Sequence, residues 1–220
     1  MQAAKREAME TRTAAATLTD RQRDVLEATL DLIVKGQRPL SMIAVARAAS
    51  CSKETLYRWF GDRDGLLTAT VRWQAAKVRG VDLPNGPIDA GFLNEALTRF
   101  AADWLRVLSS STSVALNRLA IAEAGSETLD LGAIVLRNGP EEMARRIAPL
   151  FAAARASGLL RYAQEDEAFS TFFGLVVKDL QVRMLLGETQ NAMIDIDGTA
   201  KSAADRFMVL YGPEPNGDRG

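Results

Sequence analysis

SMIAVARAASCSKETLYRWFGDRDGLLTATV, residues 41–71, is the stretch of sequence that decides the fold. Ser41 is a helix-capping residue ahead of a short run with apolar residues at helical spacing, and Ser52 is a second capping residue ahead of residues 53–60. The few residues between these two predicted helices leave room only for a tight turn. Two short helices joined by such a turn are typical of a helix-turn-helix unit, whose second helix enters the major groove of DNA.

The second of these predicted helices has an apolar side and a polar side. Leu56 and Phe60 stand four residues apart, so they face the protein core together. The polar and basic side chains on the other faces are available to DNA: Lys53, Thr55, Tyr57 and Arg58. The start of this helix, which Ser52 caps, also carries free backbone N–H groups that favour a phosphate.

The segments on either side of this unit are also predicted to be helical. Thr19 and Gln22 have the spacing of a capping box, ahead of a helix with periodic apolar residues that ends at Gly36. Asp62 caps a further helix that runs to about Gly80. The remaining helices are expected at about residues 93–108, 112–125, 140–156, 164–187 and 199–211. Because alternating β-branched runs do not occur, the sequence predicts an all-α fold.

A loop over residues 81–87, with two prolines and a glycine, is the best candidate for a domain boundary. We therefore predict a flexible N-terminal arm over residues 1–17, a helix-turn-helix DNA-binding domain over residues 18–80, and a helical domain over residues 81–220. The sequence has no apolar run of about 18 residues and no apolar core of signal-peptide length near its start. We expect a cytoplasmic protein without a membrane span.

The composition excludes several kinds of enzyme and metal site. The chain contains no histidine, so a histidine-dependent catalytic triad and a zinc–histidine site are excluded. Phosphate-loop, dinucleotide and paired-cysteine motifs do not occur, so we expect neither an enzyme nor a cofactor or metal. Residues 1–80 carry 14 Lys/Arg and 9 Asp/Glu, a net +5, whereas the remaining residues carry 13 and 19, a net −6. A basic N-terminal segment followed by an acidic remainder is suited to binding a partner with phosphates. Surface charge also varies along chains for no functional reason.

Residues 41–71 resemble the DNA-binding domain of the tetracycline-repressor (TetR/AcrR) family. The positions that match the family pattern are Ser41-Met42, Val45-Ala46, Ala49, Ser52, Thr55-Leu56-Tyr57, Phe60 and Leu66. Ser50 stands where the family has a turn glycine, which implies slight strain or a shifted turn. Cys51 replaces a valine and is either a small buried residue or a redox-sensing thiol. Arg63 replaces a lysine and keeps its positive charge.

The resemblance implies a DNA-binding site with two kinds of contact. Lys53 and Thr55 are expected near base edges. Phosphate contacts, which position the protein without reading sequence, are expected from Ser41, Tyr57 and Arg63. Two other basic side chains are either additional groove-side contacts or solvated surface charges: Arg47 and Arg58.

In the TetR family the remaining helices form a ligand pocket and a dimer interface. Residues 120–160 are similar to the AefR-like C-terminal type within that family. The predicted pocket-lining residues are Phe100, Trp104, Leu108, Leu119, Met143, Ile147, Phe172, Phe173 and Val176. Side chains of this kind at helical spacing are otherwise simply core. Because few of them are polar, they favour a small, largely apolar effector. Arg118 or Glu123 is a candidate anchor for a polar end of that effector.

The homodimer is expected to form through the helices near residues 164–187 and 199–211. The first of these is apolar nearly all round, so it must bury more than one face. A dimer with two recognition helices predicts a palindromic operator.

The sequence therefore predicts a ligand-responsive transcriptional regulator, with double-stranded DNA, a lipophilic effector and a second copy of the chain as partners. A repressor that the effector releases from its operator is the leading hypothesis, and an activator would use the same sequence. The alternative is a small-molecule-binding or dimerisation protein whose DNA-binding unit is no longer used.

Overall fold

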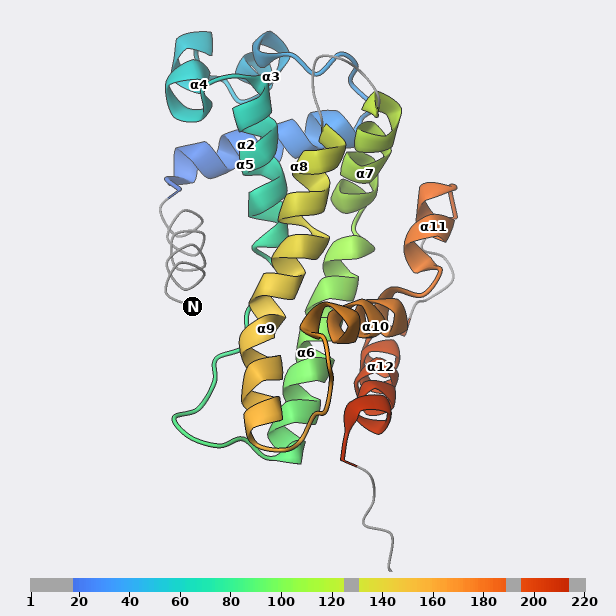
Figure 1. Cartoon of the computed structure of the whole chain (residues 1–220). Coiled ribbons are helices and arrows are strands. Elements are labelled where there is room, and N and C mark those ends of the chain that lie inside the picture. Colours follow the sequence, from blue (N-terminus) through green and yellow to red (C-terminus); the bar gives the residue numbers. More distant parts are fainter. Residues whose placement is uncertain (1–17, 125–130, 189–194, 214–220) are drawn as a thin grey trace, which may run out of the picture. The chain divides into compact units, whose positions relative to one another are not determined.

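The computed structural model describes residues 18–124, 131–188 and 195–213, and all regular structure in these ranges is helical (Figure 1). The helices are α2 (Asp20–Val34), α3 (Met42–Ala48), α4 (Lys53–Phe60), α5 (Arg63–Ala75), α6 (Ala90–Leu108), α7 (Ser111–Glu123), α8 (Leu131–Asn138), α9 (Pro140–Ala156), α10 (Glu165–Val177), α11 (Leu180–Leu185) and α12 (Ile196–Tyr211). The predicted all-α fold is confirmed for the described ranges. The arm predicted over residues 1–17 lies outside them.

The chain divides into two compact units, and each unit is built from two separate stretches of sequence. Among the described residues, the first unit contains those from Leu18 to Lys77 and those from Ser110 to Met143. The second unit contains Val78–Ser109 and the described residues from Ala144 to Pro213. The predicted DNA-binding helices α2–α5 therefore share a compact unit with α7 and α8, whose residues fall within the helical domain predicted over residues 81–220. The division into a DNA-binding domain over residues 18–80 and a helical domain over residues 81–220 stays a prediction.

Helix α2 packs against three other helices of the first unit, α3, α5 and α7. The predicted capping box is present, because the Thr19 hydroxyl accepts the backbone N–H of Gln22 at 3.2 Å and the Gln22 side chain accepts the N–H of Thr19 at 2.9 Å. The periodic apolar face of α2 that follows is buried: Val25, Leu26, Leu30 and Ile33. Packing of this face determines the stability of the helix more than its intrinsic propensity does.

The core of the first unit also takes residues from five other helices. Helices α3, α4 and α5 contribute Met42, Val45, Ala46, Leu56, Leu66, Leu67 and Val71. Helices α7 and α8 contribute Leu116, Leu119, Ala120, Leu131 and Ile134 to the same cluster. Helix α2 contacts α3, α5 and α7, and α8 contacts both α5 and α7. The N-terminal helix-turn-helix is therefore braced by residues more than 40 positions further along the chain.

The second unit packs around α6, which contacts both α10 and α12. Three buried phenylalanines interlock at its centre. The ring centroids of Phe151 and Phe207 are 5.2 Å apart, and those of Phe172 and Phe207 are also 5.2 Å apart. Aromatic pairs at such spacings stabilise a core beyond the burial of their area.

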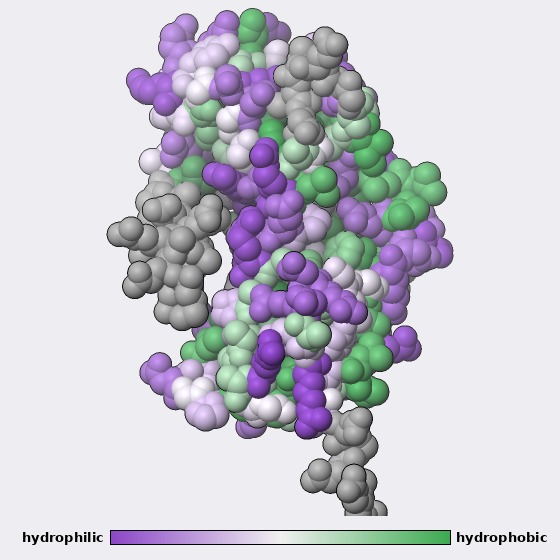
Figure 2. All heavy atoms as spheres, viewed as in Figure 1, coloured by the Kyte–Doolittle hydropathy of each residue, from purple (hydrophilic) through white to green (hydrophobic). Residues whose placement is uncertain are grey.

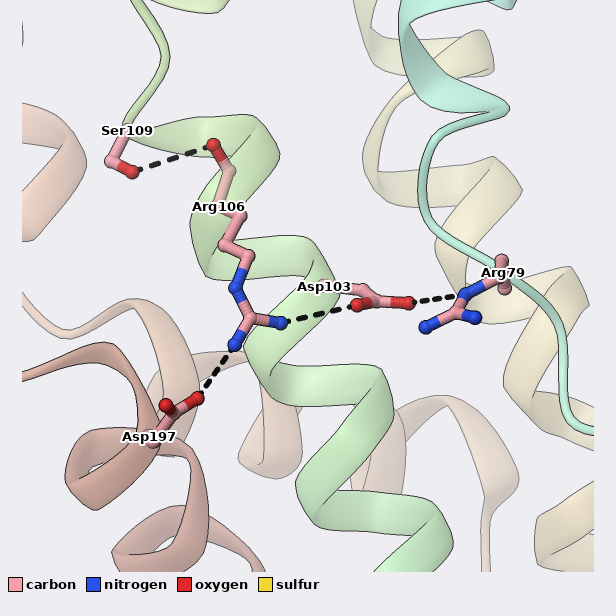
Figure 3. A network of polar contacts seen from close by, with 5 residues as sticks. All are labelled: Arg79, Asp103, Arg106, Ser109 and Asp197. Carbon is pink, nitrogen blue, oxygen red and sulfur yellow. Dashed lines mark hydrogen bonds and ion pairs between the residues drawn. The ribbon is translucent and has the colours of Figure 1, made fainter.

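A polar network on α6 ties three parts of the second unit together (Figure 3). The nearly buried Asp103 carboxylate accepts from Arg79 Nε at 3.0 Å and from Arg106 Nη1 at 3.3 Å. Arg106 Nη2 also reaches Asp197 Oδ1, at 2.6 Å, on the first turn of α12. The network thus joins the segment after α5, helix α6 and the start of α12. Because both arginines are largely exposed, its contribution to stability is modest.

Three expectations about the helices need correction. The single helix predicted over residues 164–187 is wrong, because Lys178 has φ +48° and separates α10 from α11. A residue in this left-handed region cannot continue an α-helix. Helix α8 was not predicted at all, and α5 ends at Ala75 rather than near Gly80.

A search of the described residues finds no helix with the length and apolarity that crossing a membrane requires.

Leu56 is the side chain of α4 that the core encloses completely, with 0% of its surface exposed. We expect Leu56→Ala to lower the free energy of unfolding by about 2–5 kcal/mol, because it leaves a cavity under α4. Ile43 on α3 is 58% exposed, so Ile43→Ala is the matched control and should change stability by less than about 0.5 kcal/mol. Urea titration followed by circular dichroism measures both. Equal effects of the two substitutions would contradict this account of how α4 is held.

Candidate nucleic-acid interface

Both serines that the sequence predicted as caps do cap the helices of the turn. The Ser41 hydroxyl accepts the backbone N–H of Ala44 at 3.2 Å, and the Ser52 hydroxyl accepts that of Thr55 at 3.1 Å. Each cap satisfies an N–H group that would otherwise lack a partner within its helix. The helices α3 and α4 therefore begin where the sequence predicted, and the short connection between them is fixed at both ends.

The turn between α3 and α4 carries the strain that its sequence implied. Ser50 has φ +49°, a conformation that glycine adopts freely and serine does not. Arg21 on α2 holds the turn from outside, because its Nη2 donates to the carbonyl oxygens of Ala49 at 2.9 Å and Ser50 at 2.7 Å. The role of Arg21 could not be predicted from the sequence, since nothing local links it to residues 28 and 29 positions away.

Helix α4 turns its apolar side inward and leaves its basic side in solvent. Leu56 is fully buried, and Phe60 packs half-buried against the same core. Lys53, Tyr57 and Arg58 are exposed on the outer side. The Lys53 ammonium lies 5.5 Å from the centre of the Tyr57 ring, a cation–π distance. An exposed helix with this arrangement can offer cations, a ring and a phenol to a polyanion.

Two other residues predicted to contact DNA are less exposed to solvent. Thr55 is half-buried, and its hydroxyl lies 3.0 Å from that of Ser52. Arg63, the first residue of α5, is also half-buried and is held within the first unit. Its Nε donates to the Leu40 carbonyl at 2.9 Å, and its Nη2 donates to Glu123 at 2.7 Å. This ion pair spans 60 positions and could not be predicted from the sequence. Arg47, by contrast, is exposed on α3.

An acidic residue also stands at the start of the predicted recognition helix. Hydrogen bonds from the backbone N–H of Glu54 itself and from the Ser52 hydroxyl hold the pKa of the Glu54 carboxyl below its usual range. Glu54 is fully exposed and belongs to the first turn of α4. Its negative charge is stabilised by the helix N-terminus, which is the same position that a phosphate would favour.

The predicted pocket-lining residues do not all gather in one place. Trp104 stacks on Phe169 with ring centroids 5.9 Å apart, and the Phe173 ring lies 5.2 Å from it. Phe100 meets Trp104 edge-on at 6.0 Å. Phe172 instead joins the buried ring cluster described above. The other buried members from the second unit are Ile147 and Val176, and Leu108 on α6 is half-buried.

Two members of the predicted lining lie in the first unit, namely Leu119 and Met143. Leu119 is buried in the core of the first unit, and Met143 is buried as well. Glu123, considered as an anchor for the effector, pairs with Arg63 instead. A hollow of about 580 Å³ in the second unit has a different lining altogether: Arg155, Gly158, Leu160, Arg161, Tyr162 and Ala163.

Within the described residues, no group of three or more His, Cys, Asp or Glu side chains is placed to hold a metal ion. Cys51, the residue with two predicted roles, is half-buried against the core of the first unit.

Comparisons with known proteins find similarity to transcriptional regulators over most of the chain. Residues 95–213 match the model of the AefR-like transcriptional repressor C-terminal domain. The structure is similar to a TetR transcriptional regulator from Agrobacterium tumefaciens, with 45% sequence identity, a TM-score of 0.77, and coverage of 90% of this chain and 97% of that one. It is also similar to the flavonoid-responsive regulator FrrA, with 28% identity, a TM-score of 0.64, and coverage of 89% and 98%.

A TetR-family regulator from Mesorhizobium loti shares the fold, with 22% identity, a TM-score of 0.66, and coverage of 88% of this chain and 97% of that one. No curated protein sequence matches the chain.

The strained turn gives a test that needs only stability measurements. We expect Ser50→Gly to raise the free energy of unfolding by up to about 1 kcal/mol, because glycine adopts φ +49° without a Cβ penalty. Ser50→Ala, the matched control, keeps the Cβ and should not stabilise the protein. If both substitutions shift the urea midpoint equally, the turn is not strained at Ser50.

Proposed function

The chain belongs to the TetR family of transcriptional regulators and is a ligand-responsive regulator of that kind, and we propose that it represses transcription by binding a palindromic operator as a homodimer. TetR regulators bind DNA operators and small-molecule effectors as dimers, and as a family they are not enzymes. The observation that supports the proposal best is the orientation of α4, which buries its apolar side and exposes its basic side. Burial of Leu56 turns Lys53 and Tyr57 outward.

The DNA contacts divide by the chemistry of the side chains. Lys53 and Thr55 contact base edges in the major groove, where a cation or a hydroxyl can distinguish base pairs. Phosphates are contacted by Ser41, Tyr57 and Arg63, and these contacts set the register of α4 on the duplex. The remaining contacts of the groove side come from Arg47, Ser52 and Arg58. The exposure of both arginines supports this role.

The homodimer forms through α10, α11 and α12 in this proposal. Large apolar side chains are exposed on or directly beside two of these helices: Val182 on α11, Leu186 immediately after it, and Val209 and Leu210 on α12. Figure 2 shows hydrophobic surface over both. Leu186 and Val209 are 84% and 83% exposed, which is costly for an isolated chain in water. A two-fold contact between copies covers this surface and presents two α4 helices to a palindrome.

The effector in this proposal is a small, largely apolar molecule that binds the second unit. The ring group of Phe100, Trp104, Phe169 and Phe173 supports an aromatic ligand, since two of its rings, Phe169 and Phe173, are partly exposed. The similarity to FrrA, which responds to flavonoids, supports the same class of ligand. The effector releases the repressor only if it binds the DNA-free conformation more tightly, because coupling between two sites is a difference in affinity.

Selection of duplexes from a random DNA pool tests the proposed function. We expect a palindromic sequence bound with nanomolar affinity at physiological salt, as is typical of specific sites. Tyr57→Ala should weaken this binding by about tenfold or more, because each protomer loses a hydrogen bond to a phosphate. Tyr57→Phe keeps the ring beside Lys53 and removes only the hydroxyl. It therefore separates the effect of the phosphate contact from that of the cation–π contact with Lys53.

Failure to enrich any sequence, with only weak binding that disappears at moderate salt, would overturn the proposal. That result would instead favour the alternative, a small-molecule-binding or dimerisation protein whose DNA-binding unit is unused.

A further inference from the structure

Arg63 already has two partners inside the first unit. Its Nε donates to the Leu40 carbonyl at 2.9 Å, and its Nη2 donates to Glu123 Oε1 at 2.7 Å. The side chains of Arg63 and Glu123 are 29% and 25% exposed, so the pair is shielded but still open to solvent. Glu123 is the last residue of α7, and Arg63 is the first residue of α5.

A DNA phosphate and the Glu123 carboxylate make the same demand on this guanidinium. Both are anions that accept charge-assisted hydrogen bonds from its N–H groups. A phosphate that reached Arg63 Nη2 would also come close to the carboxylate, and two like charges at such a distance repel each other. The geometry therefore favours one anion at this position rather than two.

We propose that Glu123 competes with a DNA phosphate for Arg63, and that each protomer exchanges the carboxylate for the phosphate when it binds DNA. This inference rests on the proposed function, because it requires the α3–α5 face to bind a duplex. It assigns to Glu123 a role in setting DNA affinity. From the sequence alone, Glu123 is a candidate only for anchoring a polar end of the effector.

The hydrogen bond from Arg63 to the Leu40 carbonyl allows the exchange to take place without a large movement. Leu40 immediately precedes Ser41, which is itself a proposed phosphate contact. The bond from Arg63 Nε to the Leu40 carbonyl keeps the guanidinium beside Ser41 while Nη2 changes partner. The arginine therefore needs no large rearrangement to pass from carboxylate to phosphate. Glu123→Gln keeps an amide oxygen that can still accept a hydrogen bond from Arg63, so the fold should tolerate this substitution.

The test compares the DNA affinities of wild type, Glu123→Gln, Arg63→Gln and the double variant over a series of salt concentrations. The probes are a fluorescent duplex with the enriched sequence and a scrambled duplex of equal length. We expect Glu123→Gln to bind both about threefold more tightly, because the competitor is gone. The slope of log K against log salt should stay close to that of wild type, because Arg63 contacts the phosphate in both complexes and only the loss of the carboxylate partner differs.

Three controls keep the result specific to this pair. In the Arg63→Gln background, Glu123→Gln should change neither the affinity nor the slope. Glu27→Gln removes an equal charge from an exposed position on α2 and should leave the affinity close to that of wild type. Glu123→Ala, which cannot hydrogen-bond Arg63 at all, should tighten binding at least as much as Glu123→Gln. Thermal melting verifies that every variant is folded.

Several results would overturn the inference. Weaker binding by Glu123→Gln would mean that the carboxylate positions Arg63 for DNA instead of competing with it. Tightening that persists without Arg63 would reflect only the general field of the removed charge. If wild type binds the enriched duplex and Glu123→Gln is identical to it, the inference fails and the proposed function stands. If wild type binds neither duplex, both fail together.

Discussion

The burial of Leu56 is the constraint on which the arrangement of the first unit depends. With 0% of its surface exposed, this side chain fixes the rotation of α4 about its own axis. Once that rotation is fixed, the neighbouring Lys53, Tyr57 and Arg58 must point away from the core. The core that receives Leu56 is built by α2, α5, α7 and α8 together. The DNA-facing chemistry of one short helix therefore rests on packing supplied by most of the unit.

The polar contacts of the same region refine what the apolar core determines. The serine caps set where α3 and α4 begin, and Arg21 clamps the strained turn between them through two backbone carbonyls. At the start of α5, Arg63 joins the residue before α3 to the end of α7. Basic side chains that the sequence suggests are free on the surface, such as Arg21 and Arg63, thus also hold parts of the first unit together. Glu54 and Glu123 add negative charges close to positions proposed to meet phosphates.

The sequence could predict those features that arise within one turn of helix. The capping box of Thr19 and Gln22, the cap at Ser52 and the strain at Ser50 all depend on neighbours a few positions away. The TetR resemblance rests on the same local pattern. Contacts between distant residues could not be predicted, because periodicity says which face of a helix is apolar but not what covers it. Leu119 was therefore expected at a ligand pocket and lies in the core of the first unit. The break at Lys178 was missed for a related reason, since α10 and α11 are apolar in sequence on both sides of it.

The central claim is that the α3–α4 face of the first unit meets the duplex, and hydrogen–deuterium exchange tests it most directly. Backbone exchange is compared for the free chain and for the chain with the enriched duplex, since exchange reports local protection residue by residue. The account predicts slower exchange over residues 41–63 when the duplex is present, and little change in α9. Protection confined to the second unit, with residues 41–63 unaffected by a duplex that is bound, would contradict it.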